Sequence, residues 1–300
     1  MRVQVPPRAQ ITASRSGLPQ ETLRPPGMIT RMAPTPSGFL HAGNGAAFVL
    51  AWQLARQAGG QVLLRIDDLD AERVRPEYVQ DIFDTLAWLG VDWDLGPRSP
   101  KELQESWSQH LRLAEYNRLL AELRDAGHLY ACDCSRSQIA ARGAKAEYDG
   151  HCRGRNLPMD KPDVAWRLKL PEGATVAMRT WPDGKPQEHL VETPDPVVRQ
   201  RTGRPAYQVA SLADDLRFGV DFIVRGMDLL PSTMVQLHMA KLLGLGKFGR
   251  VLFLHHALLA GPDGRKMSKS AGAASLRHWR ESGKGPSEVF AMADRLMARS

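Results

Sequence analysis

Residues 29–55 read ITRMAPTPSGFLHAGNGAAFVLAWQLA. Residues 29–33 predict a short strand, because the two prolines and the glycine that follow prevent it from continuing. The apolar stretch 45–55 predicts a helix that ends near the pair of glycines beyond it. Residues 41–44 therefore lie where a strand leads into a helix N-terminus. Free backbone N–H groups and the helix dipole make such a junction favourable for an anion.

Three residues at this junction suit a phosphate group. His41 can donate a hydrogen bond to a phosphate oxygen, Gly43 lets a ligand approach the backbone, and Asn44 stands beside them. The ordinary alternative is a strand–helix junction with an incidental histidine. The junction alone does not decide between these interpretations.

A second segment, residues 261–270, reads GPDGRKMSKS. It predicts a glycine-rich loop that carries three cations and two hydroxyl groups. Lysines such as Lys266 and Lys269 suit a triphosphate whose charge shifts as pyrophosphate leaves, because they stabilise the charge that develops in the transition state. A run of charges is usually only a solvated surface, so this segment by itself is weak support.

Taken together, the two segments resemble the HIGH and KMSKS signatures of class I aminoacyl-tRNA synthetases. KMSKS is unaltered, whereas HAGN keeps the first histidine and the glycine and has Asn44 where many members have a second histidine. The pattern R-x-A-P-S-P-x-G-x-x-H-x-G of the glutamyl and glutaminyl group is present with Thr35 for the first serine. RIDDLD at 65–70 and GVDFIVRG at 219–226 resemble two further blocks of that group.

This resemblance implies a site that activates an amino acid with ATP. Mg²⁺ is expected to accompany the nucleotide. His41 and Lys269 are expected to act on the phosphates as the catalytic residues. The full set of residues expected at ATP is His41, Gly43, Asn44, Lys266, Ser268 and Lys269.

The resemblance also implies a pocket for L-glutamate. By family position Arg31, Ala33 and Thr35 line this pocket, Tyr207 flanks it, and Arg225 meets the side-chain carboxylate, which a guanidinium can hold with two hydrogen bonds. Without the family, Tyr207 would be interpreted as a core aromatic and Arg225 as a surface cation.

The expected partner of the glutamate ammonium departs from the family. Glutamyl members carry Glu at this position, and this chain has Asp67. Glutaminyl enzymes also carry Asp there, but they lack the arginine that this chain keeps at Arg31. We therefore interpret Asp67 as a shifted contact and not as a switch to glutamine.

Beyond these motifs the chain alternates predicted strands and helices. Such alternation predicts a parallel doubly wound sheet, in which ligands bind beyond the carboxyl ends of the strands. The expected strands are 61–66, 221–224 and 251–254, and the expected helices are 76–89, 106–126, 206–214, 232–243, 274–281 and 287–298.

The fold prediction is an α/β protein with a Rossmann-type doubly wound parallel sheet, a zinc-containing α/β insertion and a short helical C-terminal segment. The predicted divisions are a disordered leader at 1–27, the first half of the catalytic domain at 28–130, the insertion at 131–204, the second half at 205–260, and the KMSKS loop with C-terminal helices at 261–300.

All three cysteines, Cys132, Cys134 and Cys152, lie in that insertion. An odd number of clustered cysteines argues against a disulfide framework and suggests a tetrahedral zinc site that lacks its fourth ligand. Ligand chemistry alone favours His151, since imidazole is far commoner on zinc than phenolate. The chain also resembles a subgroup, the glutamyl-queuosine tRNA(Asp) synthetases, whose pattern C-x-C…Y-x-x-x-C makes Tyr148 the fourth ligand of one structural zinc.

Only 30 residues follow the KMSKS segment, which are too few for the helical anticodon-binding domain of a full glutamyl-tRNA synthetase. The resemblance to the subgroup then implies transfer of glutamate to the queuosine base in the anticodon of tRNA(Asp). One alternative is a truncated synthetase that charges tRNA 3′ ends. Another is a non-catalytic zinc RNA-binding paralogue.

Composition adds limits to these expectations. The 300-residue chain is 43% hydrophobic and can bury a sizeable core. No apolar run approaches the ~20 residues that span a bilayer, so we expect a soluble protein without membrane contact. We further expect a cytoplasmic protein and a monomer. The net charge of +7 suits a polyanionic partner. Residues 1–27 are rich in proline and arginine without periodicity, which favours a disordered leader or a mis-assigned start over an organelle transit peptide.

Overall fold

A computed structural model describes residues 27–142, 147–258 and 275–298. Apart from Gly27, the predicted leader lies outside the described residues, as does the whole of 261–270.

The central element is a six-stranded sheet, mostly parallel, as the sequence predicted. Every neighbouring pair in this sheet runs parallel except the last, β5 with β6, which is an antiparallel hairpin. The strand order is β2 (Gln61–Leu64), β1 (Ile29–Met32), β8 (Phe222–Gly226), β9 (Leu252–His256), β5 (Thr175–Thr180) and β6 (Pro186–Leu190).

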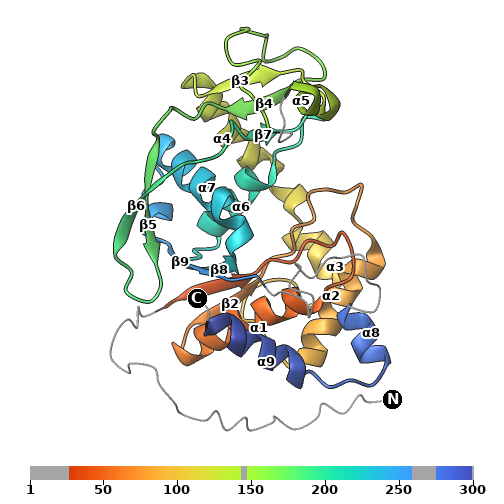
Figure 1. The fold of residues 1–300 in the computed structure, drawn as a ribbon. Helices are drawn as coiled ribbons and strands as arrows, with labels where there is room; N and C mark the ends of the chain where they lie inside the picture. Colours follow the sequence, from red (N-terminus) through yellow and green to blue (C-terminus); the bar gives the residue numbers. More distant parts are fainter. Residues whose placement is uncertain (1–26, 143–146, 259–274, 299–300) are drawn as a thin grey trace.

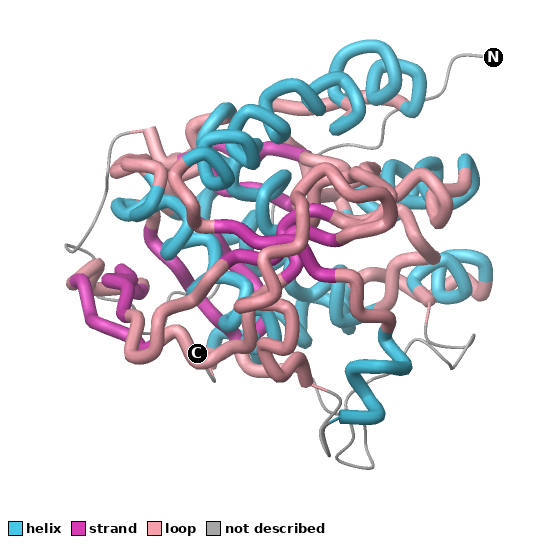
Figure 2. The backbone as a smooth tube through the Cα atoms, turned by 90° about the horizontal axis from the view of Figure 1, so that it is seen from above, coloured by secondary structure: helices cyan, strands magenta, loops and turns pink. Residues whose placement is uncertain are grey.

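Helices cover both faces of this sheet (Figures 1 and 2). Successive residues of a strand point to opposite faces, so each strand supplies two cores. In β8, for example, Phe222 and Val224 pack into one core and Ile223 into the other. The first core is built with α1 (Ala42–Gln57), α2 (Pro76–Leu89), α8 (Leu276–Glu281) and α9 (Ser287–Met297), and the second with α4 (Leu113–Asp125), α6 (Tyr207–Arg217) and α7 (Leu230–Leu242).

A second, three-stranded sheet lies at the far end of the molecule from α1 and α9 (Figure 1). It contains β3 (Leu129–Cys132), β4 (Ala165–Leu168) and β7 (Val197–Arg199), all antiparallel, with α5 (Arg136–Arg142) beside it. The hairpin β5–β6 lies between β4 and β7 in sequence but joins the large sheet. The segment 131–204 therefore supplies strands to both sheets.

The continuous helix that we expected over 106–126 is wrong in its first third. The chain forms α3 (Pro100–Glu102), a π-helical turn at Leu103–Trp107 and a 3-10 turn at Gln109–Arg112 before α4 begins. Ser108 is extended between these turns, and its hydroxyl accepts a hydrogen bond from the His110 N–H at 3.2 Å. The break buries Gln109, whose N–H donates to the Asp68 carboxylate at 2.8 Å. Tertiary hydrogen bonds thus outweigh helical periodicity here.

The helix predicted for 76–89 is confirmed with the same bounds. Pro76 opens α2 at a position where a helix needs no N–H, and Gly90 ends it in the left-handed region with φ 68°. Short 3-10 turns at Met227–Leu229 and Phe248–Arg250 complete the described elements. In the part of the chain that the structure describes, no helix is both long and apolar enough to cross a membrane.

Candidate active site

His41 occupies the N-cap of α1 in an extended conformation. Its Nδ1 accepts a hydrogen bond from the Asn44 N–H at 3.3 Å, and the Asn44 side-chain oxygen accepts one from the His41 N–H at 3.2 Å. Asn44 therefore closes a reciprocal capping box. A neutral imidazole that accepts at Nδ1 carries its proton on Nε2, so Nε2 is the ring nitrogen of His41 that can donate. A Cβ at Gly43 would lie 3.1 Å from the imidazole Cε1, so even an alanine there crowds the ring.

The chain returns to this junction immediately after the KMSKS segment. Ser275 forms an antiparallel bridge with His41, and the Leu276 N–H donates to the Leu40 carbonyl at 2.8 Å. From Ser275 onward, the chain is thereby held beside the N-terminus of α1. Lys266, Ser268 and Lys269 themselves lie outside the described residues, so their placement at ATP remains a prediction.

Arginines cluster where the parallel strands end. Arg31 lies on β1, Arg65 directly follows β2, and Arg225 lies on β8 opposite His255 of β9 in the register of the sheet. Each of the three arginines is at most 4% exposed. The carboxyl ends of adjacent parallel strands are the usual position for a ligand in this class of sheet.

Two of these arginines share one buried carboxylate. Asp215, on α6, accepts from the Arg65 Nη1 at 2.7 Å and from the Arg31 Nε at 3.3 Å through the same oxygen. Arg31 also donates to the Val224 carbonyl at 3.2 Å, and Arg65 to the Ser211 hydroxyl at 3.0 Å. The second oxygen of Asp215 is buried without a partner. Helix α6 is therefore joined to β1 and β2 by charge-assisted bonds beneath the site.

Asp67 lies with both carboxylate oxygens on Arg65. The Arg65 Nε donates to one oxygen at 2.7 Å and Nη2 to the other at 3.1 Å. Burial raises the pKa of Asp67 to about 6, even though the neighbouring Arg65 guanidinium opposes the shift. The carboxylate that we expected at the glutamate ammonium is thus held in a fixed orientation by an arginine that the sequence reasoning did not single out.

Arg225 has more donors than partners. Its Nη1 donates to the Gln236 side-chain oxygen at 3.0 Å, while Nε and Nη2 are buried and have no hydrogen-bond partner. The guanidinium carbon lies 5.5 Å from the centre of the Phe253 ring. Burial lowers the pKa of Arg225 to about 10, so the group stays charged at neutral pH. Among the described residues, no carboxylate lies within ion-pair distance of it.

The remaining residues that we expected at glutamate are less buried. Tyr207 begins α6 and is 36% exposed, and it acts electrostatically on Arg225. Ala33 is half-buried and Thr35 is exposed, both in the turn that follows β1. The structure thus gathers Arg31 and Asp67 through Asp215 and Arg65, and Arg225 lies on the neighbouring strand of the sheet.

Cys132, Cys134 and Cys152 form a cluster at the end of β3. Their three sulfur atoms all lie within 4.8 Å of one another, and the Sγ atoms of Cys134 and Cys152 are 3.4 Å apart. Zinc–sulfur bonds of about 2.3 Å in a tetrahedron place sulfurs about 3.8 Å apart, so this spacing fits one zinc ion. The Tyr148 hydroxyl accepts from the Cys152 N–H at 2.8 Å, and its ring packs against the cluster. His151 is exposed and is not part of the cysteine cluster.

Three arginines surround the cysteine cluster. Arg142 donates to the Cys134 sulfur at 3.1 Å, Arg155 lies 3.5 Å from the Cys152 sulfur, and the Arg167 guanidinium lies 3.5 Å from the centre of the Tyr148 ring. A zinc ion with three thiolates and one phenolate would carry a net charge of −2. These guanidinium groups would offset that charge, which supports the donor set that the sequence predicted.

Sequence reasoning missed most of the buried residues that orient this site. Arg65, Asp214, Asp215 and Gln236 were not singled out, although Arg65 opens the RIDDLD block. Asp214 receives the Arg112 guanidinium at 2.7 and 3.0 Å and the Tyr116 hydroxyl at 2.7 Å, and these bonds join α4 to α6. The adjacent acids in Leu212-Ala213-Asp214-Asp215-Leu216 were the available signal, because two acids within an otherwise apolar helical run require buried partners.

A family model described as tRNA synthetases class I (E and Q), catalytic domain, matches residues 27–298. The chain is 39% identical over 272 residues to a protein of Nitratidesulfovibrio vulgaris named Glutamyl-Q tRNA(Asp) synthetase, covering 84% of this chain and 81% of that protein. It is 34% identical over 275 residues to Glutamate--tRNA ligase 1 of Acidithiobacillus ferrooxidans, covering 89% of this chain and 56% of that protein.

A solved glutamate-tRNA synthetase from Elizabethkingia anophelis has the same fold, with a TM-score of 0.68 at 23% identity. The similarity covers 86% of this chain and 54% of that one, so the chain spans about half the length of this structure and of the ligase above. All residues of the site and of the cysteine cluster lie within the matched range 27–298.

Proposed function

The chain belongs to the family of class I tRNA synthetase catalytic domains for glutamate and glutamine, and we propose that it activates glutamate with ATP and transfers the glutamyl group to the queuosine base in the anticodon of tRNA(Asp). The observation that supports glutamate activation is the incomplete hydrogen bonding of the Arg225 guanidinium. It is a buried, charged group whose Nε and Nη2 have no hydrogen-bond partner, and it lies at the carboxyl end of a central strand.

A carboxylate is the ligand that best completes Arg225. Unpaired buried donors cost free energy, and a planar guanidinium satisfies two of them with one carboxylate. Gln236 already accepts from the remaining nitrogen, Nη1, and this hydrogen bond fixes the plane of the guanidinium. A glutamine amide offers a single oxygen and no charge, so the geometry favours glutamate. Asp67 would take the ammonium, and Arg31 would line the pocket beside it.

The expected chemistry needs no covalent step on the protein. An oxygen of the glutamate α-carboxylate attacks the α-phosphorus of ATP, the bond to the β-phosphate oxygen breaks, and pyrophosphate leaves. His41 would donate from Nε2 to a phosphate oxygen, and Lys266 and Lys269 would stabilise the charge that moves to pyrophosphate. Mg²⁺ bound with ATP would neutralise part of the phosphate charge. The glutamyl carbon is then attacked by a nucleophile on the RNA, and AMP leaves.

The choice of acceptor is supported by two observations. The relative named Glutamyl-Q tRNA(Asp) synthetase is 39% identical to this chain. The cysteine cluster also has Tyr148 and not His151 beside it, which matches the ligand pattern of the subgroup that the sequence resembles. The metal would be structural, since four protein ligands leave no open position. It would hold β3 and the following loop in place for contact with RNA.

Charging of a tRNA 3′ end is the second candidate. It is favoured by the 34% identity to Glutamate--tRNA ligase 1, which extends over 89% of this chain. Both candidates share the activation step and differ in the acceptor. A non-catalytic zinc RNA-binding protein would share neither step.

Pyrophosphate exchange into ATP tests the activation step. We expect exchange that depends on glutamate, needs no RNA, and is at least about 100-fold less efficient with glutamine, because Arg225 would lose its charged partner. Removing the protein's zinc should leave the amino-acid preference unchanged. Exchange that is absent with every amino acid, in a folded protein that binds ATP, would instead support a non-catalytic role.

A further inference from the structure

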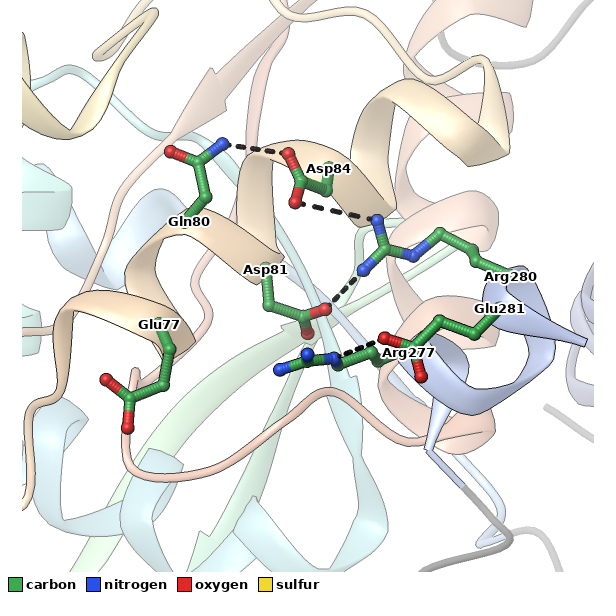
Figure 3. A pocket seen from close by; sticks show the side chains of 7 residues that line it. All are labelled: Glu77, Gln80, Asp81, Asp84, Arg277, Arg280 and Glu281. Carbon is green, nitrogen blue, oxygen red and sulfur yellow. Dashed lines mark hydrogen bonds and ion pairs between the residues drawn. The ribbon is translucent and has the colours of Figure 1, made fainter.

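Asp81 is a buried acid that the proposed reaction does not use. It lies on α2 and is 3% exposed. One carboxylate oxygen accepts from the Leu40 N–H at 3.4 Å. The other accepts from the Arg280 Nη2 at 2.5 Å (Figure 3). Leu40 directly precedes His41, and Arg280 lies on α8, the first helix after the KMSKS segment. The Asp81 side chain thus contacts both the turn that precedes His41 and the helix α8.

The peptide groups of Leu40 are held from two sides. Its N–H donates to Asp81 of α2, and its carbonyl accepts from the N–H of Leu276 at 2.8 Å, at the start of α8. Leu40 and Leu276 are both buried in the first core. The position of the turn before His41 therefore depends on where α8 lies relative to α2.

The turn before His41, α2 and α8 also contact one another on the surface. The Arg277 guanidinium of α8 lies 4.7 Å from the centre of the Phe39 ring, and Phe39 packs edge-on against Tyr78 of α2 at 4.9 Å. Between α2 and α8 lies a hollow of about 400 Å³, lined by acids of α2 and by arginines of α8 (Figure 3). Asp81 lies at this hollow, and the more exposed Asp84 lies one turn further along α2, with an oxygen 3.7 Å from Arg280.

Asp81 and Asp84 differ in their burial and in the contacts that they make. Burial raises the pKa of Asp81, and the Leu40 N–H and Arg280 counteract that shift. Removing one member of a buried charged pair leaves the other charge without compensation. Asp84 touches Arg280 only at its longer distance and, unlike Asp81, makes no hydrogen bond to the entry turn.

We propose that Asp81 is a positioning residue that couples the turn carrying His41 to α8, so that His41 keeps a fixed position at the N-terminus of α1. The inference rests on the proposed function for its catalytic consequence. Asp81 acts through Leu40 and Arg280 and does not touch the substrate.

The test compares Asp81→Asn with Asp84→Asn in the full chain. The first change keeps an oxygen for Leu40 and removes the charge that holds Arg280, and the second removes only the exposed contact. We expect Asp81→Asn to lower kcat for glutamate-dependent exchange about tenfold, with KM for glutamate within about twofold of wild type, because misplacing phosphate groups affects the transition state more than the amino-acid pocket. Asp84→Asn should stay within about twofold in both parameters.

Substitutions of Arg280, the partner of Asp81, provide a second test. Arg280→Gln should reproduce the loss in kcat, and Arg280→Lys should restore part of it, because a lysine keeps the charge. Circular dichroism and thermal unfolding establish that each variant is folded. If Asp81→Asn does not fold, the Arg280 variants carry the test.

A folded Asp81→Asn with wild-type kcat, or one that loses only thermal stability, overturns the proposal. Absence of exchange in the wild type would contradict the proposed function instead. The coupling is then measured by calorimetric titration with ATP alone, where Asp81→Asn should weaken binding severalfold and Asp84→Asn should not. Equal ATP affinities for wild type and Asp81→Asn would contradict the coupling in that case.

Discussion

In the proposed glutamate pocket, the carboxylate of Asp67 already has its hydrogen-bond partner, whereas the guanidinium of Arg225 is only partly paired. Arg65 occupies both oxygens of Asp67, so this carboxylate is rigid before any ligand arrives. Arg225 has one hydrogen-bond partner at Nη1, and its Nε and Nη2 have none. A pocket with one fixed acid and one incomplete cation is preorganised for a zwitterion that carries a second carboxylate.

Arg225→Gln should lower kcat/KM for glutamate about 100-fold or more, because truncating a buried charged partner costs about 2–5 kcal/mol. The KM for ATP should change little. Steady-state exchange kinetics measure both values. Arg250→Gln, at an exposed arginine outside the pocket, is the matched control and should behave as wild type. A glutamate kcat/KM within threefold of wild type in Arg225→Gln would contradict the assignment.

Glutamate binding should weaken as the pH falls through the pKa of Asp67, which burial raises to about 6. The deprotonated form attracts the ammonium, and it is lost below that pKa. The affinity at pH 5 should therefore be about tenfold lower than at pH 7. The charged groups acting on Asp67 are Arg65, Asp214 and Asp215, and His255, with a pKa lowered to about 3, stays neutral in this window.

Calorimetric titration with glutamate alone measures this dependence without any contribution from the phosphate-binding groups. Asp67→Asn should bind glutamate weakly and with a flat profile between pH 5 and 7. An unchanged slope in that variant would place the titrating group elsewhere.

At the scale of elements, the site depends on how closely α1 packs against the two C-terminal helices. A Cβ at Gly45 of α1 would lie 2.7 Å from the Leu276 side chain and 3.1 Å from that of Val289. The same packing brings the start of α8 to Leu40. Glycine is required here for close approach of helices and not for an unusual backbone conformation.

Gly45→Val should lower the free energy of unfolding by about 1–3 kcal/mol, because extra atoms in a packed interface force the helices apart. Urea unfolding measures the change. Ala47→Val is the control, since residue 47 lies about 200° further around the helix and is half-buried. If both variants unfold at the same urea concentration as wild type, the interface is looser than described.

The cysteine cluster is expected to bind zinc with Tyr148 as its fourth ligand. Tyr148→Phe keeps the ring under Arg167 and removes only the oxygen, so zinc affinity should fall about 10–100-fold, as when a polar group at a metal site is lost. Competition with a chromophoric chelator measures the affinity. His151→Ala should bind zinc as tightly as wild type. A weakened His151→Ala with an intact Tyr148→Phe would reverse the choice of fourth ligand.

For the whole molecule, the sequence predicted what depends on local pattern. Prolines, glycines and helical periodicity located β1, α1 and α2, and the cysteine spacing located the cluster. The strands between residues 165 and 199 were missed for different reasons. β6 is largely exposed, and β4 and β7 are short. β5 is longer, but its sequence TVAMRT has three consecutive apolar residues and no clear alternation. Burial and tertiary bonding, not local pattern, interrupt the helix expected at 106–126.

The network under the site could not be predicted for a different reason. Arg65 and Asp215 are 150 positions apart, and Asp81 and Arg280 are 199 apart. No periodicity relates residues at such separations, so only the folded sheet brings them together. Recognisable motifs identify residues that face substrates, whereas the residues that orient them become visible in the structure.

Transfer of labelled glutamate to tRNA tests the central claim most directly, because it asks in one measurement whether the site activates glutamate and which RNA accepts it. Total tRNA from cells that make queuosine is compared with tRNA from otherwise identical cells that do not. The account predicts label on tRNA(Asp) from the first source alone. Equal labelling of both preparations, with the label on a 3′ end, would contradict it and favour a tRNA-charging enzyme.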